Sequence, residues 1–383
     1  MNNFAKEEKK SNIFAELKRF MPNIANEINA KDDKGNTPLL RLLGDEYGEN
    51  TVEMIQVLLD LGADINVKNN MGYTPLLMAC GARNYNYENK NFYANDNNVF
   101  ELDVIEKLLN SGADITCKDI RNNDALIMSI CGWNCNVGKK IGMLVDAGVD
   151  INNKNCTGKN SIIVLCETIG KYFAKYPNDA GKFPDLFIEV LEILIEIGTD
   201  VNICVNKKRN AISYLFQYSG DWVISAIKMI LENGFDIKNI IGCDCDSILH
   251  DAWNKKTLCC EKIKLLADYK CDLNMISKHK IPFIATILNY LDCGMKNCPY
   301  NGECKFINGR VYCKERYDAI NLLIGYGVNI SDVLKNQHKF HFKMIETANS
   351  EFDDKCKQKY YNAIQKMFEY EKELAELKEM MAK

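Results

Sequence analysis

The stretch from Leu58 to Cys80, LLDLGADINVKNNMGYTPLLMAC, restricts the fold more than any other part of the chain. Two leucines close one helix, and Gly62 is suited to the left-handed conformation that ends it at low cost. After a polar turn, Thr74 is placed to cap a second helix, and Pro75 occupies the first helical position, where a missing N–H is harmless. A helix pair this short cannot bury its apolar side alone. It must therefore stack on further copies of itself.

Copies of this junction recur along the chain, and residues 29–37, NAKDDKGNT, repeat its polar turn. Successive helix starts are separated by 37, 50, 36, 50, 36 and 36 residues. The equivalent helix starts are Thr37, Thr74, Asp124, Asn160, Asn210, Asp246 and Pro282, and the helix ends are Gly62, Gly112, Gly148, Gly198, Gly234, Lys270 and Gly327. All but the last of these starts carry side chains that cap helices. The pattern resembles the ankyrin repeat family over roughly residues 11–331 and is most specific in the first two junctions.

This resemblance implies an all-α solenoid of stacked helix pairs joined by finger-like turns, with about seven repeats. We expect an N-terminal capping half-repeat over residues 1–30 and the repeat array over residues 31–331. The two intervals of 50 residues, and the 45 residues from Pro282 to Gly327, predict insertions between the two helices of a repeat, near residues 83–98, 170–184 and 291–313. Residues 332–383 are expected to supply a C-terminal cap and a long amphipathic helix.

The C-terminal helix has one apolar face. Its apolar residues recur at steps of three, four or seven, and they are Ile364, Met367, Leu374, Leu377 and Met381. We expect the first half to cap the solenoid and the part after about Tyr370 to project, where it is available to a partner helix.

Composition limits the classes of function. The chain of 383 residues has a formal net charge of -4, so it has no overall attraction to nucleic acid or to an anionic membrane. No segment reaches the ~18 uninterrupted apolar residues of a membrane span, and the N-terminus is charged where a secretory signal would be apolar. Most of the 17 cysteines stand singly at expected core positions, which is typical of a reducing compartment. We expect a cytoplasmic protein, in the host cytoplasm if it is viral or an effector.

No motif predicts catalysis. The sequence has no phosphate-binding loop, nucleophile elbow, zinc-protease motif or dinucleotide fingerprint. It has four histidines, and His250 is expected on an inner helix as a groove or packing residue. The expected function is therefore non-catalytic.

One group of cysteines stands apart from the rest. Residues 293–313, CGMKNCPYNGECKFINGRVYC, place four cysteines in an insertion too short for its own core, and these are Cys293, Cys298, Cys304 and Cys313. Four thiolates suit tetrahedral zinc, although the spacing lacks the paired C-x-x-C pattern. The centre resembles part of a CCCH zinc finger, but the histidine is missing and only Cys313 could replace it. Structural zinc, an unligated or redox-labile loop and two disulfides all remain open.

The resemblance implies that a partner protein binds the concave surface formed by the fingers and the inner helices. The outward positions of the inner helices are expected to hold Arg41, Met78, Met128, Val164, Tyr214, His250 and Thr286, a row that is unusually apolar for a solvated face. The fingers carry a basic row that would attract an acidic patch: Lys34, Arg121, Lys159, Lys207, Lys208, Arg209, Lys278 and Lys280.

We expect a monomeric scaffold or adaptor that binds another protein and no membrane. The alternative is a nucleic-acid-associated protein that uses the basic fingers and a zinc-bearing loop.

The cysteine group generates the first prediction. If residues 293–313 bind zinc, protein purified without chelator should contain about one equivalent of metal, because four thiolates complete one tetrahedral site. Replacing Cys298 and Cys304 together by Ser should remove it. A zinc content below about a tenth of an equivalent in the unmodified protein would contradict the site.

Overall fold

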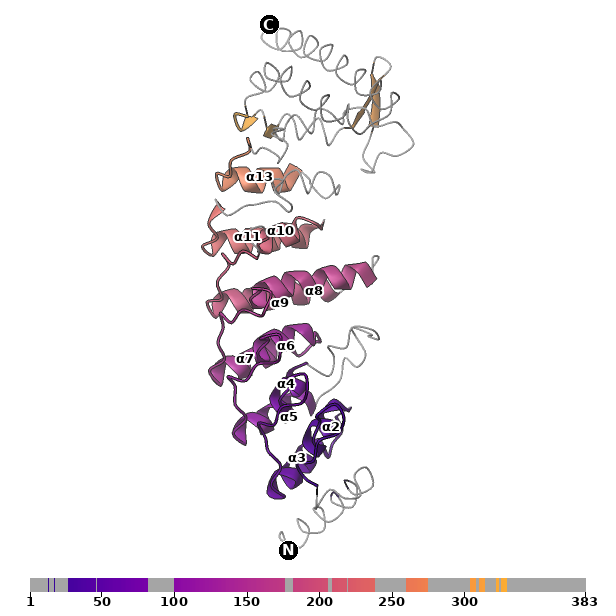
Figure 1. Cartoon of the computed structure of the whole chain (residues 1–383). Coiled ribbons are helices and arrows are strands. Elements are labelled where there is room, and N and C mark those ends of the chain that lie inside the picture. Colours follow the sequence, from indigo (N-terminus) through magenta and orange to yellow (C-terminus); the bar gives the residue numbers. More distant parts are fainter. Residues whose placement is uncertain are drawn as a thin grey trace, which may run out of the picture. The chain divides into compact units, whose positions relative to one another are not determined.

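Figure 1 shows the computed structural model of the chain. The structure describes residues 13, 17, 27–45, 47–81, 100–175, 182–205, 209–218, 220–237, 260–274, 304–307, 310–313, 322–323 and 325–328. They fall into two compact units, residues 1–207 and 208–383. Most of the predicted N-terminal cap, the insertion near residues 83–98, and the C-terminal segment 332–383 lie outside the described residues, as do Asp246, His250, Pro282 and Thr286. The count of seven repeats stays a prediction.

The first unit consists of helix pairs stacked in chain order (Figure 1). Its described helices are α2 Pro38–Gly44, α3 Thr51–Asp60, α4 Pro75–Cys80, α5 Phe100–Asn110, α6 Ala125–Cys131, α7 Val137–Asp146, α8 Ser161–Lys175 and α9 Lys182–Glu196. The first, inner helix of each pair contacts the next inner helix, in the order α2, α4, α6 and α8. The second helices make a parallel row from α3 through α5 and α7 to α9. This arrangement confirms the predicted stack of helix pairs for the first unit.

The second unit continues the helical pattern and adds a small sheet. Its described helices are α10 Ala211–Leu215, α11 Asp221–Glu232 and α13 Cys260–Asp268, with α11 packed on both of the others. Strands β1 Cys304–Ile307 and β2 Arg310–Cys313 pair antiparallel, with Cys304 opposite Cys313. The segment near 291–313, expected as a loop, therefore includes a β-hairpin.

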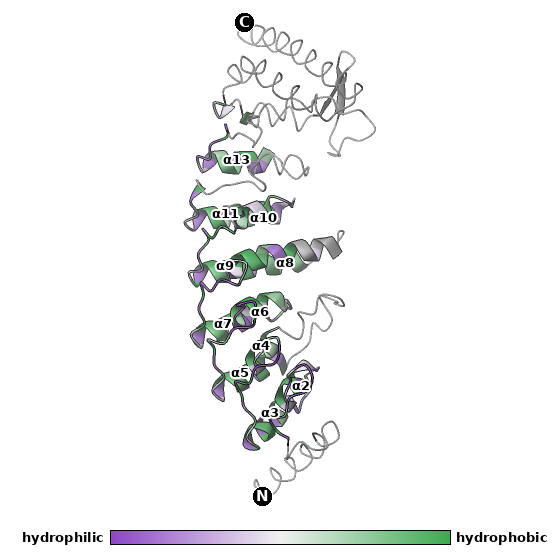
Figure 2. Cartoon of the chain, viewed as in Figure 1, coloured by the Kyte–Doolittle hydropathy of each residue, from purple (hydrophilic) through white to green (hydrophobic). Residues whose placement is uncertain are grey.

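The core lies between the two helix rows. Figure 2 shows apolar residues gathered on the helices and polar residues at the turns that join them. Leu39 and Leu43 of α2, and Ile55 and Leu58 of α3, are completely buried. Burying such a side chain stabilises the fold by about 1.5–3 kcal/mol, so stacking rather than helix propensity holds these short helices together.

Side-chain caps start most inner helices, as predicted. The Thr74 hydroxyl accepts from the Leu77 N–H, and Asp124, Asn160 and Asn210 accept from the N–H three residues further on, at distances of 2.9 to 3.3 Å. Thr37 is the exception, because its buried hydroxyl makes no such bond. The cap prediction is wrong there, and Pro38 at the first helical position starts α2 instead.

The predicted helix ends also share one backbone conformation. The six glycines of the pattern have φ between 81° and 91°, and Lys270 adopts φ 60° at the equivalent place. The residue that breaks the sequence pattern therefore keeps its geometry, at the steric cost that a β-carbon adds in this region.

The insertion near residues 170–184 was expected to leave the array between the two helices. Instead, α8 and α9 are both lengthened to 15 residues, whereas α4 has six. The Tyr172 and Phe183 rings stack at 3.8 Å, and Trp133 lies 4.9 Å from Phe183. All three aromatic side chains are buried. Covering this aromatic cluster explains why the added residues continue the helices.

Two buried lysines tie neighbouring repeats together. Lys140 and Lys262 each stand eight residues before a helix-ending residue, and both are almost fully buried. The Lys140 ammonium donates to the carbonyl oxygen of Cys80 at 3.4 Å and pairs with Glu101 at 3.3 Å. The Lys262 ammonium donates to the carbonyl oxygens of Phe216 and Tyr218. Each lysine therefore places a positive charge at the C-terminal end of the preceding inner helix, where the helix dipole favours it.

The cap at Asp124 lacks a hydrogen bond that the equivalent cap at Asn160 makes. Asn160 donates its amide Nδ2 to the carbonyl oxygen of Asp200 in the next turn at 2.8 Å. Asp124 has an oxygen in place of that donor, and its Oδ2 is buried without a hydrogen-bond partner in the described part of the chain. Burial, with a smaller contribution from the nearby Asp150 charge, raises the pKa of Asp124 to about 6, against the opposing effects of the Ile127 N–H and of Lys118.

This difference generates the second prediction. The raised pKa of Asp124 means that its stabilising neutral form is fully present below about pH 4 and is lost as the pH rises through about 6. Asp124→Asn keeps the cap and restores the donor, so it should stabilise the protein at pH 7 by up to about 3 kcal/mol, and the gain should vanish near pH 4. Denaturant unfolding at the two pH values measures this. Asn160→Asp is the matched reverse change and should destabilise at pH 7.

Candidate functional site

Four fingers of the first unit are built on the same turn. We use finger for the six residues before each cap, which are 31–36, 68–73, 118–123 and 154–159. In each finger, one Oδ1 oxygen accepts the N–H groups two and four residues further on, at 2.8 to 3.1 Å. The residues that supply this oxygen are Asp32, Asn69, Asp119 and Asn155. The local chemistry of Asp and Asn therefore closes every turn.

Backbone hydrogen bonds join the fingers into a ladder. The N–H of Asn70 donates to the carbonyl oxygen of Lys34 at 3.0 Å, and that of Ile120 donates to Met71 at 3.2 Å. The N–H of Cys156 continues the ladder to Arg121 at 2.7 Å. The fingers approach so closely that a β-carbon on Gly72 would lie 2.9 Å from the Ile120 nitrogen. Neighbouring fingers are therefore fixed relative to one another within this unit.

The tips of the fingers differ in chemistry although their backbones are alike. The two tip residues are Asp33 and Lys34, then Asn70 and Met71, then Ile120 and Arg121, and finally Cys156 and Thr157. Met71 is 38% exposed and Ile120 is 62% exposed. Because the first finger makes the same turn with two charged residues, the fold does not require apolar side chains at these positions.

The predicted row on the inner helices is mostly buried, which corrects our expectation of a solvated face. Met128 is fully buried, and Met78, Val164 and Tyr214 are at most 9% exposed. The Met78 side chain reaches the preceding repeat, where a β-carbon on Gly44 would lie 3.6 Å from its Cε. The position therefore packs between successive inner helices, and its apolar character belongs to the core. Only Arg41 is exposed among the described members.

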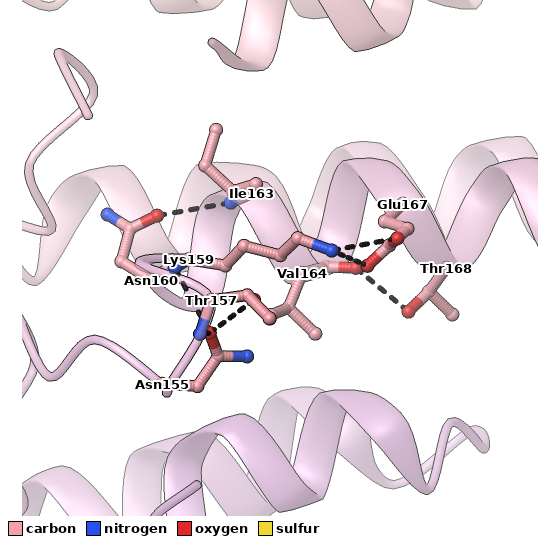
Figure 3. A network of polar contacts seen from close by, with 8 residues as sticks. All are labelled: Asn155, Thr157, Lys159, Asn160, Ile163, Val164, Glu167 and Thr168. Atoms are coloured by element: carbon pink, nitrogen blue, oxygen red, sulfur yellow. Dashed lines mark hydrogen bonds and ion pairs between the residues drawn. The ribbon is translucent and has the colours of Figure 1, made fainter. Parts of the chain in front are cut away.

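An ion pair joins one finger to the exposed side of its inner helix, and Figure 3 shows it together with the turn. The Lys159 ammonium lies 2.9 and 2.8 Å from the two carboxylate oxygens of Glu167 on α8. Both side chains are partly exposed. Glu167 was missed from the sequence, although its spacing of seven residues from the Asn160 cap places it on the exposed side of α8.

The basic row is only partly available to a partner. Lys34 is exposed and Arg121 is half-buried. In the second unit, the Arg209 guanidinium lies 5.6 Å from the centre of the Tyr214 ring, a cation–π contact that brings two candidate residues together. Lys207, Lys208, Lys278 and Lys280 lie outside the described residues.

A second basic row was overlooked in the sequence. The first residue of every finger is a lysine, and the four are Lys31, Lys68, Lys118 and Lys154. Lys31 donates to the carbonyl oxygen of Lys68 at 2.8 Å, and Lys118 donates to Asn153 Oδ1 at 2.5 Å. The recurrence at the repeat interval was the available signal.

The cysteines belong to two kinds. Cys80 and Cys166 are buried thiols in the core, and burial raises the pKa of Cys80 to about 12, so it is a neutral apolar residue as expected. In the predicted metal loop, Cys304 and Cys313 are cross-strand partners, whereas Cys293 and Cys298 are not described. Among the described residues, no group of three or more metal-ligating side chains comes together. The zinc site therefore stays a prediction.

Part of the chain is similar to known ankyrin repeats. The ankyrin repeat family model matches residues 34–70 and 71–120. A solved ankyrin repeat domain from Acinetobacter baumannii AYE is similar at 18% sequence identity and a TM-score of 0.41, over 58% of this chain and 95% of that one. No curated protein matches the chain.

Residues 34–120 are therefore ankyrin repeats, as the sequence pattern predicted. Ankyrin repeats generally mediate binding between proteins, and the family is typically non-enzymatic. None of the helices in the described ranges is long and apolar enough to cross a membrane.

Proposed function

We propose that the chain is a non-catalytic scaffold or adaptor that binds a partner protein through its finger tips and the adjoining exposed side of the inner helices. The exposure of Ile120 carries this proposal. A β-branched apolar side chain that is 62% exposed costs solvation free energy, and the equivalent residues Asp33 and Asn70 make the same turn without that cost.

Three features support binding at the fingers. The Asp and Asn turns and the ladder hold the tips before any partner arrives, which lowers the entropy lost on association. Arg41 and Arg121 add side chains of a kind that interfaces favour, and Lys34 adds a positive charge at the first tip. The Lys159–Glu167 pair adds partly exposed ions between the fourth finger and α8.

We also propose that the protein is monomeric and cytoplasmic. The buried thiols Cys80 and Cys166 support a reducing compartment. The predicted amphipathic helix after residue 351 would offer a second contact to a partner helix.

Site-specific photocrosslinking tests the proposed surface. A photoreactive amino acid replaces Lys34 or Thr157 at the tips, and in matched controls it replaces Asp103 on α5 or Glu192 on α9, all of them exposed positions. In extract of the cells that make the protein, the tip variants should give a protein adduct that resists ribonuclease, and the controls should not.

Two results would contradict the proposed function. One is an adduct that forms equally from α5 and α9, or no adduct from the tips. The other is an adduct that disappears on ribonuclease treatment, which would favour nucleic acid as the partner.

A further inference from the structure

We propose that the tips of the second and third fingers form a docking site for an acidic segment of a partner protein that carries a large apolar side chain. Met71 and Ile120 would receive the apolar side chain, and the lysines and arginine around them would receive the acidic ones. This inference rests on the proposed function and adds the chemistry of the partner.

The two apolar residues form one patch because their backbones touch. The Ile120 N–H donates to the Met71 carbonyl oxygen at 3.2 Å, so the two side chains leave adjoining rungs of the ladder. With exposures of 38% and 62%, both side chains present apolar surface to solvent. Each finger turn is closed by its own Asn69 or Asp119 oxygen, which keeps the patch in place.

The fold does not explain this patch. The equivalent tip positions in the first and fourth fingers are Asp33, Lys34, Cys156 and Thr157, and the four turns have matching hydrogen bonds. Polar residues therefore satisfy every structural requirement of the tip. Met is among the residues that interfaces favour, so this apolar pair is suited to contact an apolar side chain of a partner.

The surrounding charge selects the partner. Fingers two to four contain five basic residues and one acidic residue: Lys68, Lys118, Arg121, Lys154, Lys159 and Asp119. The Asp119 carboxylate is buried and accepts hydrogen bonds from the Arg121 and Asn123 N–H groups and from the Asn123 amide. Glu167 neutralises Lys159, and Lys68 lies near enough to the exposed Asp114 carboxylate to help lower its pKa, whereas Lys154 is an exposed positive charge on this strip.

The positive strip contrasts with the formal net charge of -4 of the whole chain. An acidic partner segment would thus be attracted to this strip, which favours binding at this site. Nucleic acid would satisfy the charge but not the exposed Ile120 and Met71, so a protein segment fits better.

Selection of random linear peptides displayed on phage, with the full-length chain as bait, tests this site. Enriched peptides should combine acidic residues with a large apolar residue. A synthetic copy should bind by fluorescence anisotropy, and its affinity should fall as salt is raised.

Matched substitutions assign the binding to the patch. Ile120→Asn, which copies Asn70 of the preceding finger, and Met71→Ala should each weaken peptide binding on the order of tenfold. Leu61→Ala changes a residue of similar exposure, 37%, after α3 and should have no effect. Lys68→Glu and Lys154→Glu should weaken binding, whereas Lys139→Glu on an exposed position of α7 should not. Unchanged thermal midpoints exclude misfolding of the variants.

The proposal is overturned if no peptide is enriched, if the enriched peptides lack acidic residues, or if Ile120→Asn leaves their affinity unchanged. Displacement of the peptide from a wild-type chain by a single-stranded RNA of matched charge, with RNA binding insensitive to Ile120→Asn, would also overturn it. A tip crosslink to a protein would still stand in each case, so failure here is distinguishable from failure of the proposed function.

Discussion

The first unit depends on one side-chain oxygen in each finger. Asp32, Asn69, Asp119 and Asn155 use Oδ1 to accept two backbone N–H groups, which closes the turn between one helix pair and the next. Closed turns can line up, and the ladder from Lys34 to Cys156 follows from that alignment. Each turn also delivers the chain to the next cap, so each inner helix starts directly after a finger and stacks on the inner helix before it. A local interaction between side chain and backbone thereby fixes a long-range arrangement.

The backbone hydrogen bonds between fingers and the Oδ1 oxygen of each turn hold the fingers in place, so the side chains at the tips can vary. The tips of the four fingers range from Asp33 and Lys34 to Met71 and Ile120 without a change in the turn. Function can then change at the tips while stability depends on the caps, the buried helices and ties such as Lys140 with Glu101. The burial of Met128 supports the same division, because this inner-helix side chain lies in the core of the unit and not at its surface.

The sequence predicted what depends on near neighbours in the chain. The caps at Thr74, Asp124, Asn160 and Asn210, and the left-handed residues from Gly62 to Lys270, follow from chemistry within a few residues. It failed where a residue's surroundings come from another repeat. Met78 packs near Gly44 of the preceding repeat, and the lengthening of α8 and α9 depends on an aromatic cluster that includes Trp133. The sequence also did not predict the exposed apolar patch, because only the hydrogen bonds between fingers show that Ile120 and Met71 lie on adjoining rungs.

Amide hydrogen exchange at the ladder tests the central claim, that the fingers are held independently of their tip side chains. The amides of Asn70, Ile120 and Cys156 donate from one finger to the next, so they should exchange much more slowly than in an unstructured peptide. Residue 120 should keep this protection in Ile120→Asn, while Asn155→Ala, which removes a turn oxygen, should speed exchange at Cys156. Exchange of all three amides at unstructured rates, or loss of the ladder's protection in Ile120→Asn, would contradict the account.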